Sequence, residues 1–482
     1  MPCGSNMRAV YPTFLLCAYG FFSNLRPLEP FLTPYLMGPD KNLTETQVVN
    51  EIYPIWTYSY LVLLFPIFLA TDYLCYKPVL ILQATSLLVT YVMLLKAQGL
   101  VVMQLLEFFF GLATASDIAY YAYIYSVVEP GHYQRVTGYC RSVTLFGSAA
   151  GSLTGQLLLS VAKVQLLHLV IITLASFSVA FFAPWFLPMP KGSLFFHKSS
   201  GEGQEKPRSN SAALLEKVED SETKVPLTAQ CASTVRSLEA AGHSRGFVDV
   251  LRMLSTDFLQ CYKCRPLLAW SLWWALATCG YFQVINYAQP LWEKIRPSHH
   301  NEIYNGYVET ISTLLGALAA LLVSCLPVCW ALWGELTLCI LSMLMAVCVF
   351  VMDMLKNIWL CYCAYVLFRT TYMLLITVAT YQIAATLSMQ RYALVFGVNT
   401  FMALLLQTLL TLVVVDSAGL GLDVITQFFI YCCYFAAISL VFFLAGLSKL
   451  ASRKRSEQAV PATGRAETES DSPPISATRS CL

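Results

Sequence analysis

The sequence predicts an all-α polytopic membrane protein with twelve transmembrane helices in two six-helix halves. Composition is the first observation behind this prediction. Of the 482 residues, 57% are hydrophobic and 12% are charged, and the mean hydropathy is +0.61. An average soluble domain has about 25% charged residues, and a soluble chain of this size cannot bury so much apolar surface. The composition therefore argues against a soluble enzyme, a nucleic-acid-binding protein or a disordered scaffold.

The apolar stretches give the second observation. A helix needs about 20 apolar residues to cross a bilayer, and the chain contains six such stretches on each side of a polar middle segment. The first six are 10–36, 52–71, 78–97, 100–127, 138–161 and 165–187. The second six are 266–292, 303–325, 331–352, 358–386, 392–415 and 425–447.

The polar segments divide the chain. Residues 188–264 are rich in Ser, Glu and Lys and poor in aromatics, so they cannot bury enough apolar surface to offset the entropy of ordering. We therefore predict an N-terminal half over 1–187, a largely disordered cytoplasmic linker over 188–264 and a C-terminal half over 265–448. A disordered cytoplasmic tail follows over 449–482.

The distribution of Lys and Arg sets the orientation. Most of them lie in segments that are cytoplasmic if both termini are cytoplasmic, as the positive-inside rule requires. The glycosylation sequon Asn42-Leu43-Thr44 then lies in the first external loop, where it can be modified. We expect the plasma membrane as the location.

An internal repeat is the third observation. A shift of 260 residues aligns Gly20-Phe21-Phe22 with Gly280-Tyr281-Phe282, and a shift of 256 aligns Gln134-Arg135 with Gln390-Arg391. Together with the six-plus-six pattern, these matches favour two parallel repeats of the major facilitator type. A substrate site in such a fold lies near the bilayer midplane, between the halves.

Ionisable side chains inside spans cost several kcal/mol, so each is a candidate functional residue. The candidates are Arg26, Glu29, Glu107, Asp117, Arg141, Glu309 and Arg369. In the fourth span, the spacing of 3, 4, 3 and 4 predicts one helix face for a set of five residues. These are Glu107, Phe110, Thr114, Asp117 and Tyr121. The second and seventh spans carry similar rows, Tyr53, Trp56 and Tyr60, and Phe282, Asn286 and Gln289.

Carboxylates beside aromatic faces suit a desolvated organic cation, because ring faces attract cations and carboxylates accept charge-assisted hydrogen bonds. Two alternatives remain open. The aromatic rows can be helix-packing surface, and the acids can pair with Arg26, Arg141 or Arg369, which we regard as structural or gating partners. Because its own helix face carries no basic residue, Glu107 is favoured as a substrate ligand.

No cofactor, metal or enzyme site is predicted. Cys261 and Cys264 form a single CxxC pair, whereas structural zinc requires two more ligands. No His joins a nucleophile or a metal-ligand set inside a span. The net charge of +2 gives no field that would recruit a nucleic acid, and we expect a monomer.

Several long strings resemble solute carrier family 19, over nearly all of the predicted membrane region but not in the central segment or at either end. Among them are Arg26-Pro27-Leu28-Glu29-Pro30-Phe31-Leu32-Thr33-Pro34-Tyr35, Trp56-Thr57-Tyr58-Ser59-Tyr60, His132-Tyr133-Gln134-Arg135-Val136 and Tyr392-Ala393-Leu394-Val395-Phe396-Gly397-Val398-Asn399-Thr400. The family contains thiamine transporters and the reduced folate carrier. The folate carrier has an arginine where Asp117 stands and a lysine where Gln407 stands, so the resemblance is to the thiamine branch.

The resemblance implies a thiamine uptake carrier that works by alternating access, with proton antiport as a family expectation. It implies that Glu107 binds the aminopyrimidine, that Trp56 and Tyr53 flank the rings and that Asn286 forms a hydrogen bond with the substrate. The other implied substrate-site residues are Phe110, Thr90, Glu29, Asp117 and Glu309. Rival interpretations are a carrier for pyridoxine or, with less support, folate, and a membrane receptor without transport.

Three positions depart from the pattern of the family's thiamine transporters. Phe110 stands where a tyrosine is usual, Asp117 where a glutamate is usual and Cys75 where an arginine is usual. The first two changes bear on affinity or selectivity, and the third bears on cytoplasmic gating.

Overall fold

A computed structural model describes residues 3–127, 133–189, 265–325, 330–386 and 389–458. The described residues form helices joined by short connections, with no β-strand among them. Most of the predicted linker and tail, residues 190–264 and 459–482, lies outside the described residues.

The N-terminal half follows the predicted spans, with two interruptions. Its segments are α1 (Cys3–Asn24), η1 (Glu29–Phe31), α2 (Leu32–Met37), η2 (Gln47–Ile52), α3 (Tyr53–Tyr73), α4 (Lys77–Lys96), α5 (Leu100–Ala115), α6 (Asp117–Val127), α7 (Tyr133–Ser160) and α8 (Leu166–Phe186).

Both interruptions coincide with a local feature of the sequence. The predicted span 10–36 breaks after Asn24, where Pro27 and Pro30 lack the N–H group that a continuing helix would need. The predicted span 100–127 breaks at Ser116, whose hydroxyl donates to the Leu112 carbonyl at 2.8 Å. Such bonding to the preceding turn bends helices. The five residues that we expected on one helix face are therefore divided between α5 and α6.

The C-terminal half contains one helix for each predicted span. Its segments are α11 (Arg265–Ile295), α12 (Asn305–Cys325), α13 (Trp330–Met354), α14 (Ile358–Thr386), α15 (Met389–Leu410), η4 (Thr411–Val415) and α16 (Val424–Gln458). The last helix continues past the predicted boundary at residue 448. Within the described residues, nine helical stretches are long and apolar enough to cross a membrane, and α1, α7 and α11 add helices of 22, 28 and 31 residues.

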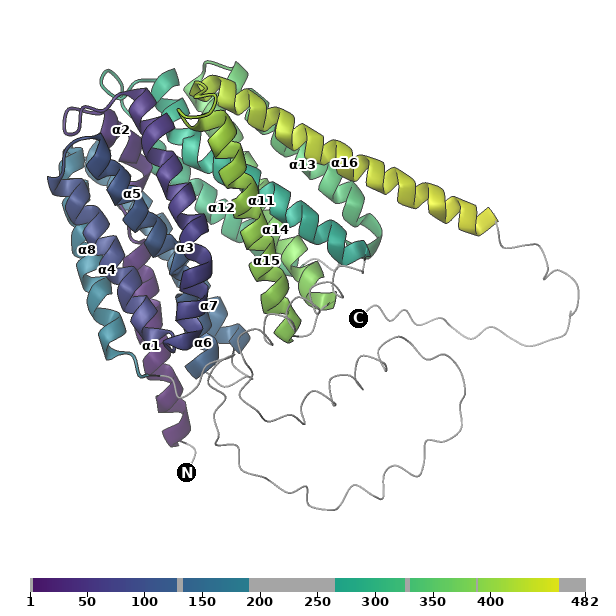
Figure 1. Ribbon diagram of the computed structural model, residues 1–482, viewed down its shortest axis with the longest axis horizontal. Coiled ribbons are helices and arrows are strands. Elements are labelled where there is room, and N and C mark those ends of the chain that lie inside the picture. Colours follow the sequence, from purple (N-terminus) through teal and green to yellow (C-terminus); the bar gives the residue numbers. More distant parts are fainter. Residues whose placement is uncertain (1–2, 128–132, 190–264, 326–329, 387–388, 459–482) are drawn as a thin grey trace, which may run out of the picture.

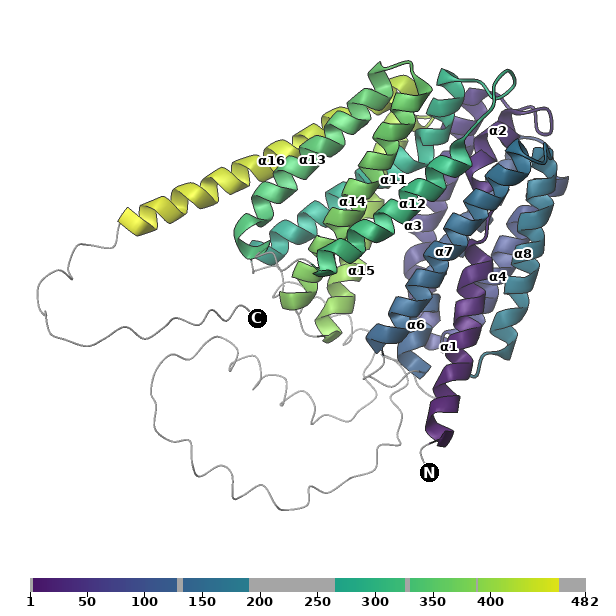
Figure 2. The same ribbon diagram turned by 180° about the vertical axis from the view of Figure 1, so that it is seen from behind.

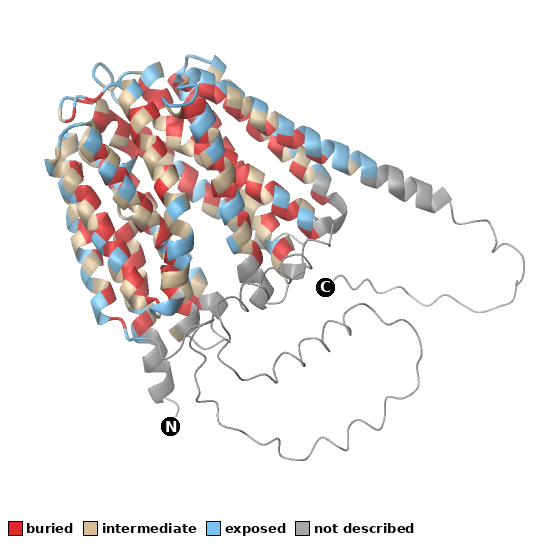
Figure 3. Cartoon of the chain, in the orientation of Figure 1, coloured by how far each residue is buried: buried red, intermediate tan, exposed pale blue. Residues whose placement is uncertain are grey.

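The two halves lie side by side, with α7 against α12 and α3 against α15 (Figures 1 and 2). Buried residues are concentrated among the packed helices of the bundle (Figure 3). Many large apolar side chains are exposed, among them Phe14, Val101, Leu321 and Leu444. This distribution is expected of a bundle whose outer surface contacts lipid.

Polar contacts join the halves at the end of the bundle opposite the start of α1, which we call the loop end (top of Figure 1). Lys294 forms ion pairs with Glu45 of the first half, at 3.0 Å, and with Asp423 of the second half. The Tyr58 hydroxyl donates to Asp416 at 2.5 Å. The Asn50 amide donates to the carbonyl oxygens of Val415 and Leu422. We call the side chains of Glu45, Asn50, Tyr58, Lys294, Asp416 and Asp423 the latch.

Candidate functional site

Glu107 lies inside α5 and is 5% exposed. No hydrogen bond or ion pair engages its carboxyl group within the described part of the chain. It interacts electrostatically with three tyrosines, Tyr53 of α3, Tyr91 of α4 and Tyr287 of α11. A buried carboxylate normally has partners, because an unpaired buried charge is costly. Glu107 therefore has unused capacity to bind a cation or a hydrogen-bond donor.

Close packing of α5 on α3 places this carboxyl group beside an aromatic surface. A Cβ atom added at Gly111, one turn after Glu107, would lie 2.0 Å from Ser59 Oγ and 3.2 Å from the Trp56 carbonyl oxygen. Only glycine permits this approach. Trp56 Nε1 also donates to Thr114 Oγ1 at 3.2 Å, which fixes the indole against α5.

Aromatic contacts continue from α3 across to the second half. The Trp56 ring lies 5.8 Å from Tyr60 and 6.4 Å from Phe282 of α11, the latter edge to face. The Tyr53 ring lies 6.2 Å from Tyr287, also of α11, and the Tyr53 hydroxyl shares a 2.7 Å hydrogen bond with Thr33. The aromatic rows therefore meet at the boundary between the halves.

Arg26 lies over the ring of Phe110. The sequence did not indicate this contact. Its guanidinium carbon is 5.7 Å from the centre of the Phe110 ring and 5.6 Å from that of Phe177. Arg26 also forms a 3.6 Å ion pair with Glu29, which is 51% exposed. The prediction that no basic residue shares the Glu107 face holds within α5, but the break after α1 brings Arg26 to Phe110 from the connection between α1 and η1. Glu29 and Phe110 therefore both contact a cation of the protein itself.

Asp117 begins α6 and belongs to a polar chain within the first half. It accepts a hydrogen bond from the Gln83 amide, and Gln83 Oε1 accepts one from the Tyr19 hydroxyl at 2.7 Å. Arg26 interacts electrostatically with Asp117 as well as with Glu29. The Asp117 side chain remains exposed.

Glu309 and Arg369 pair with each other inside the second half. Arg369 Nη1 binds the Glu309 carboxylate and Ser312 Oγ, the latter at 3.0 Å, and Tyr365 donates to Glu309 at 2.6 Å. The Glu309 and Arg369 side chains are only 18% and 14% exposed. This arrangement matches the alternative in which an acid pairs with an arginine.

The remaining candidates lie in different surroundings. Asn286 is half-buried on α11, with no hydrogen bond from its side chain to other described residues. Thr90 is buried and donates to the Ser86 carbonyl at 2.8 Å. Arg141 is exposed on α7 and interacts electrostatically with Tyr121 and with Tyr372 of α14. Asn42 is exposed in the connection after α2.

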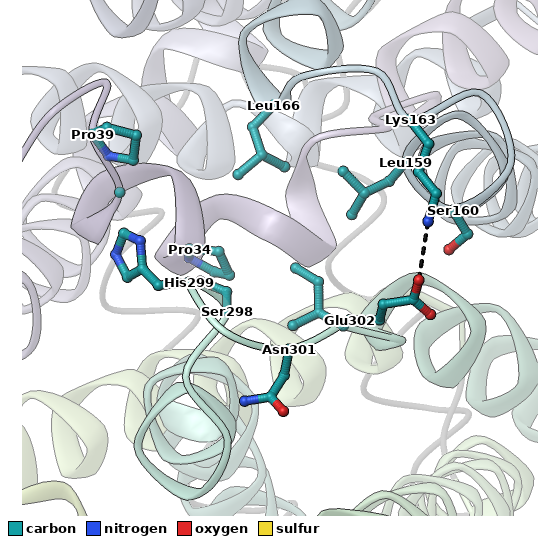
Figure 4. Close-up of a pocket in the computed structure, with 12 residues that line it drawn as sticks. Pro34, Pro39, Leu159, Ser160, Lys163, Leu166, Ser298, His299, Asn301 and Glu302 are labelled. Atoms are coloured by element: carbon teal, nitrogen blue, oxygen red, sulfur yellow. Dashed lines mark hydrogen bonds and ion pairs between the residues drawn. The ribbon is translucent and has the colours of Figure 1, made fainter.

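A cavity of about 230 Å³ lies at the loop end, away from these residues (Figure 4). Its walls come from both halves, and the ion pair between Lys163 and Glu302, at 2.9 Å, crosses it. None of the predicted site residues lines it. The described residues contain no group of side chains suited to a metal ion.

Sequence comparisons agree with this architecture. The family model described as "Reduced folate carrier" matches residues 8–430. Human "Thiamine transporter 1" is 59% identical, with 90% of this chain and 89% of that protein covered. Human "Thiamine transporter 2" is 50% identical, with 91% and 90% covered. Human "Reduced folate transporter" is 40% identical, with 90% and 71% covered.

The structural comparisons find transporters whose sequences are much less similar to this chain. The nucleoside transporter NupG superposes with a TM-score of 0.58 at 12% identity, covering 90% of this chain and 99% of that one. A POT family transporter superposes with a TM-score of 0.59 at 10% identity, covering 90% and 95%. At such identities, the likeness concerns the fold alone.

Two helical halves that meet across a polar and aromatic boundary share the fold of the superposed transporters, and the family match makes this chain a multi-pass membrane carrier. Within that class, the chain belongs to the reduced folate carrier family, which is solute carrier family 19. The resemblance of the sequence motifs to that family is thereby confirmed.

Proposed function

We propose that this protein is a thiamine uptake carrier that works by alternating access. The observation that carries the proposal is the buried Glu107 carboxyl group, which has no partner among the described residues and interacts electrostatically with Tyr53 of the first half and Tyr287 of the second. Thiamine is an organic cation with an amino-substituted ring. A carboxylate and ring faces complement both features.

In the proposed complex, Glu107 accepts hydrogen bonds from the aminopyrimidine. Trp56 and Tyr53 flank the rings, and Phe110 extends the aromatic wall. Asn286 donates a hydrogen bond from the second half, and Thr90 lies behind the site in α4. A charge-assisted hydrogen bond contributes about 1.5–3 kcal/mol, and a dry cation–π contact about 2 kcal/mol.

The other predicted charges have supporting roles in this proposal. Glu29 and Glu309 are each held by an arginine, so they shape the field around the site and keep their helices in place. Asp117 is exposed and, unlike Glu29, forms no ion pair with an arginine among the described residues, so it is the candidate for exchanging a proton with solvent if transport is coupled to pH. Arg26, Arg141 and Arg369 act as structural or gating partners.

Alternating access requires one end of the bundle to be closed while the other is open. The latch and the hydrogen bonds from Asn305 to the Pro30 carbonyl and from Gln289 to the Glu29 carbonyl join the halves at the loop end. We infer that the loop end faces the outside of the plasma membrane, with both termini cytoplasmic. The conformation is then closed to the outside, and the carrier acts as a monomer.

This orientation makes Asn42 external and available for glycosylation. Asn42 is exposed, as an acceptor must be. Treatment with a glycosidase should shift the mobility of the wild-type protein but not that of Asn42→Gln. An identical shift in both would contradict the assignment.

Uptake of labelled thiamine by cells that express Glu107→Gln tests the proposed site. The amide keeps the shape of the side chain but removes its charge, so we expect uptake to fall about tenfold or more at equal surface expression. The matched control is Glu302→Gln, which neutralises a carboxylate at the loop end. Undiminished uptake by Glu107→Gln would show that the charge of Glu107 does not select the substrate.

Competition by unlabelled vitamins tests the choice of substrate. We expect unlabelled thiamine to compete strongly and folate not to compete, because Asp117 and Gln407 stand where the family's folate carriers carry basic residues. Strong competition by pyridoxine would assign the site to both vitamins. Binding of thiamine without counterflow from preloaded vesicles would instead indicate a receptor.

A further inference from the structure

Tyr287 of α11 is 0% exposed, and its hydroxyl has no hydrogen-bond partner within the described part of the chain. Buried hydroxyl groups without partners are rare in folded proteins, because the hydrogen bond to water is lost and nothing replaces it. The Tyr287 ring lies against Tyr53 of the first half, at 6.2 Å. The unpaired hydroxyl therefore belongs to a residue at the boundary between the halves.

Glu107, in the first half, is a buried hydrogen-bond acceptor that also lacks a partner. Its carboxyl group is buried and has no hydrogen bond to a described residue, and it interacts electrostatically with Tyr287. Tyr287 can donate one hydrogen bond, and a carboxylate can only accept. A buried donor without a partner and a buried acceptor without a partner thus lie in different halves, and Tyr53, whose ring contacts Tyr287, also interacts with Glu107.

We infer that the Tyr287 hydroxyl donates a hydrogen bond to Glu107 when the substrate-free carrier changes conformation, and so takes the place of the substrate. The inference rests on the proposed function, because it assigns Glu107 to the substrate. With thiamine bound, the cation satisfies Glu107 while the halves move. Without it, the empty carrier would have to move with a buried carboxyl group that lacks a hydrogen-bond partner, which is unfavourable. Tyr287 removes that obstacle, as a positioning residue for the return step.

Two transport assays, net uptake and counterflow, should respond differently to the loss of this hydrogen bond. Net uptake requires the empty carrier to return, whereas counterflow exchanges bound substrate in both directions and bypasses the empty return. In proteoliposomes, we expect Tyr287→Phe to lower net thiamine uptake about fivefold or more and to leave counterflow within about twofold of the wild type. A purely structural role would lower both rates together.

Tyr434→Phe is the matched control. This tyrosine lies on α16 and donates to the Leu276 carbonyl at 2.8 Å, within the second half. We expect its loss to leave the ratio of net uptake to counterflow unchanged. If Tyr287→Phe fails to fold, Tyr287→His provides a second test, because it keeps a ring and a hydrogen-bond donor. We expect Tyr287→His to preserve the ratio of net uptake to counterflow. Selective loss of net uptake in Tyr287→His would overturn the inference.

The outcomes distinguish this inference from the proposed function. A wild-type protein that moves no thiamine in either assay overturns the proposed function, and the inference with it. A wild type that is active in both assays, beside a Tyr287→Phe variant that is normal in both or equally reduced in both, overturns the inference alone.

Discussion

Lys294, in the last turn of α11, forms an ion pair with Glu45 of the first half at 3.0 Å. The same ammonium group binds Asp423, in the connection that precedes α16. One lysine of the second half thus holds an acid from each half at the loop end. Both pairs are partly exposed, so each contributes about 1 kcal/mol or less.

Lys294→Gln should loosen the latch. Val49 is buried beside the latch, in the contact between the halves. A cysteine introduced by Val49→Cys should therefore react only when the loop end opens. We expect Lys294→Gln to raise the labelling rate of that cysteine by an impermeant maleimide about threefold. Lys163→Gln removes the more exposed pair with Glu302 and should have little effect. Equal labelling with and without Lys294 would show that the latch does not hold the loop end closed.

Breaking the pair between Glu309 and Arg369 should destabilise the second half. Removing one partner of a buried pair leaves an uncompensated charge and costs about 3–5 kcal/mol. We expect Arg369→Gln to lower the melting temperature in detergent strongly. The double variant Glu309→Gln with Arg369→Gln should regain part of the loss, because no buried charge remains unpaired. A double variant at least as unstable as the single one would contradict this account.

Gly111→Ala should push α5 away from α3. The new Cβ would meet Ser59 Oγ at 2.0 Å, and overpacking of this kind costs about 1–3 kcal/mol. Because Glu107 lies one turn away, thiamine affinity should fall along with stability, and Ser59→Gly should restore part of both. Gly138→Ala is the matched control, since among the described residues no atom beyond its own stretch of helix backbone lies within 4 Å of the added Cβ. Equal behaviour of the two alanine variants would show that this packing does not position the site.

The pH dependence of transport should not depend on Glu302. The hydrogen bond from Lys163, with a second from Tyr304, lowers the pKa of Glu302. A lowered pKa keeps the carboxylate ionised above the ordinary glutamate value of about 4.3, and the stabilisation is lost only as the pH falls through the lowered value. Glu302→Gln should therefore preserve the shape of the uptake profile between about pH 5.5 and pH 7.5. A flattened profile would place a titrating group in this pair.

The positions of the helices could be predicted from the sequence because hydropathy and length decide which stretches cross a bilayer. The break at Ser116 could not, because the same bond from a hydroxyl group to the preceding turn occurs at Thr90 and Thr173 inside unbroken helices. Hydropathy did not indicate it, since the stretch Leu100–Ile124 as a whole is apolar enough to cross a membrane.

The candidate site was accessible to sequence reasoning only within single helices. Helical spacing indicated that Glu107 and Phe110 share a face, but it could not show that Arg26 covers Phe110 from the break after α1. The same holds for Glu309 and Arg369, which are far apart in the chain and meet only through the packing of α12 on α14. The unpaired Tyr287 hydroxyl had no sequence signal, because a tyrosine in an apolar row is typical of helix packing.

Each half has its own hydrophobic core. The largest cluster of buried apolar residues comes from α11 to α16. Among the described residues, Val49 is its only fully buried member from the first half. Two further clusters lie within the first half. Rocking of one half against the other can therefore proceed with little loss of apolar burial. The energy of the transport motion then depends on a small number of exchangeable polar contacts, so single substitutions at the boundary should retune the speed of the cycle without unfolding the molecule.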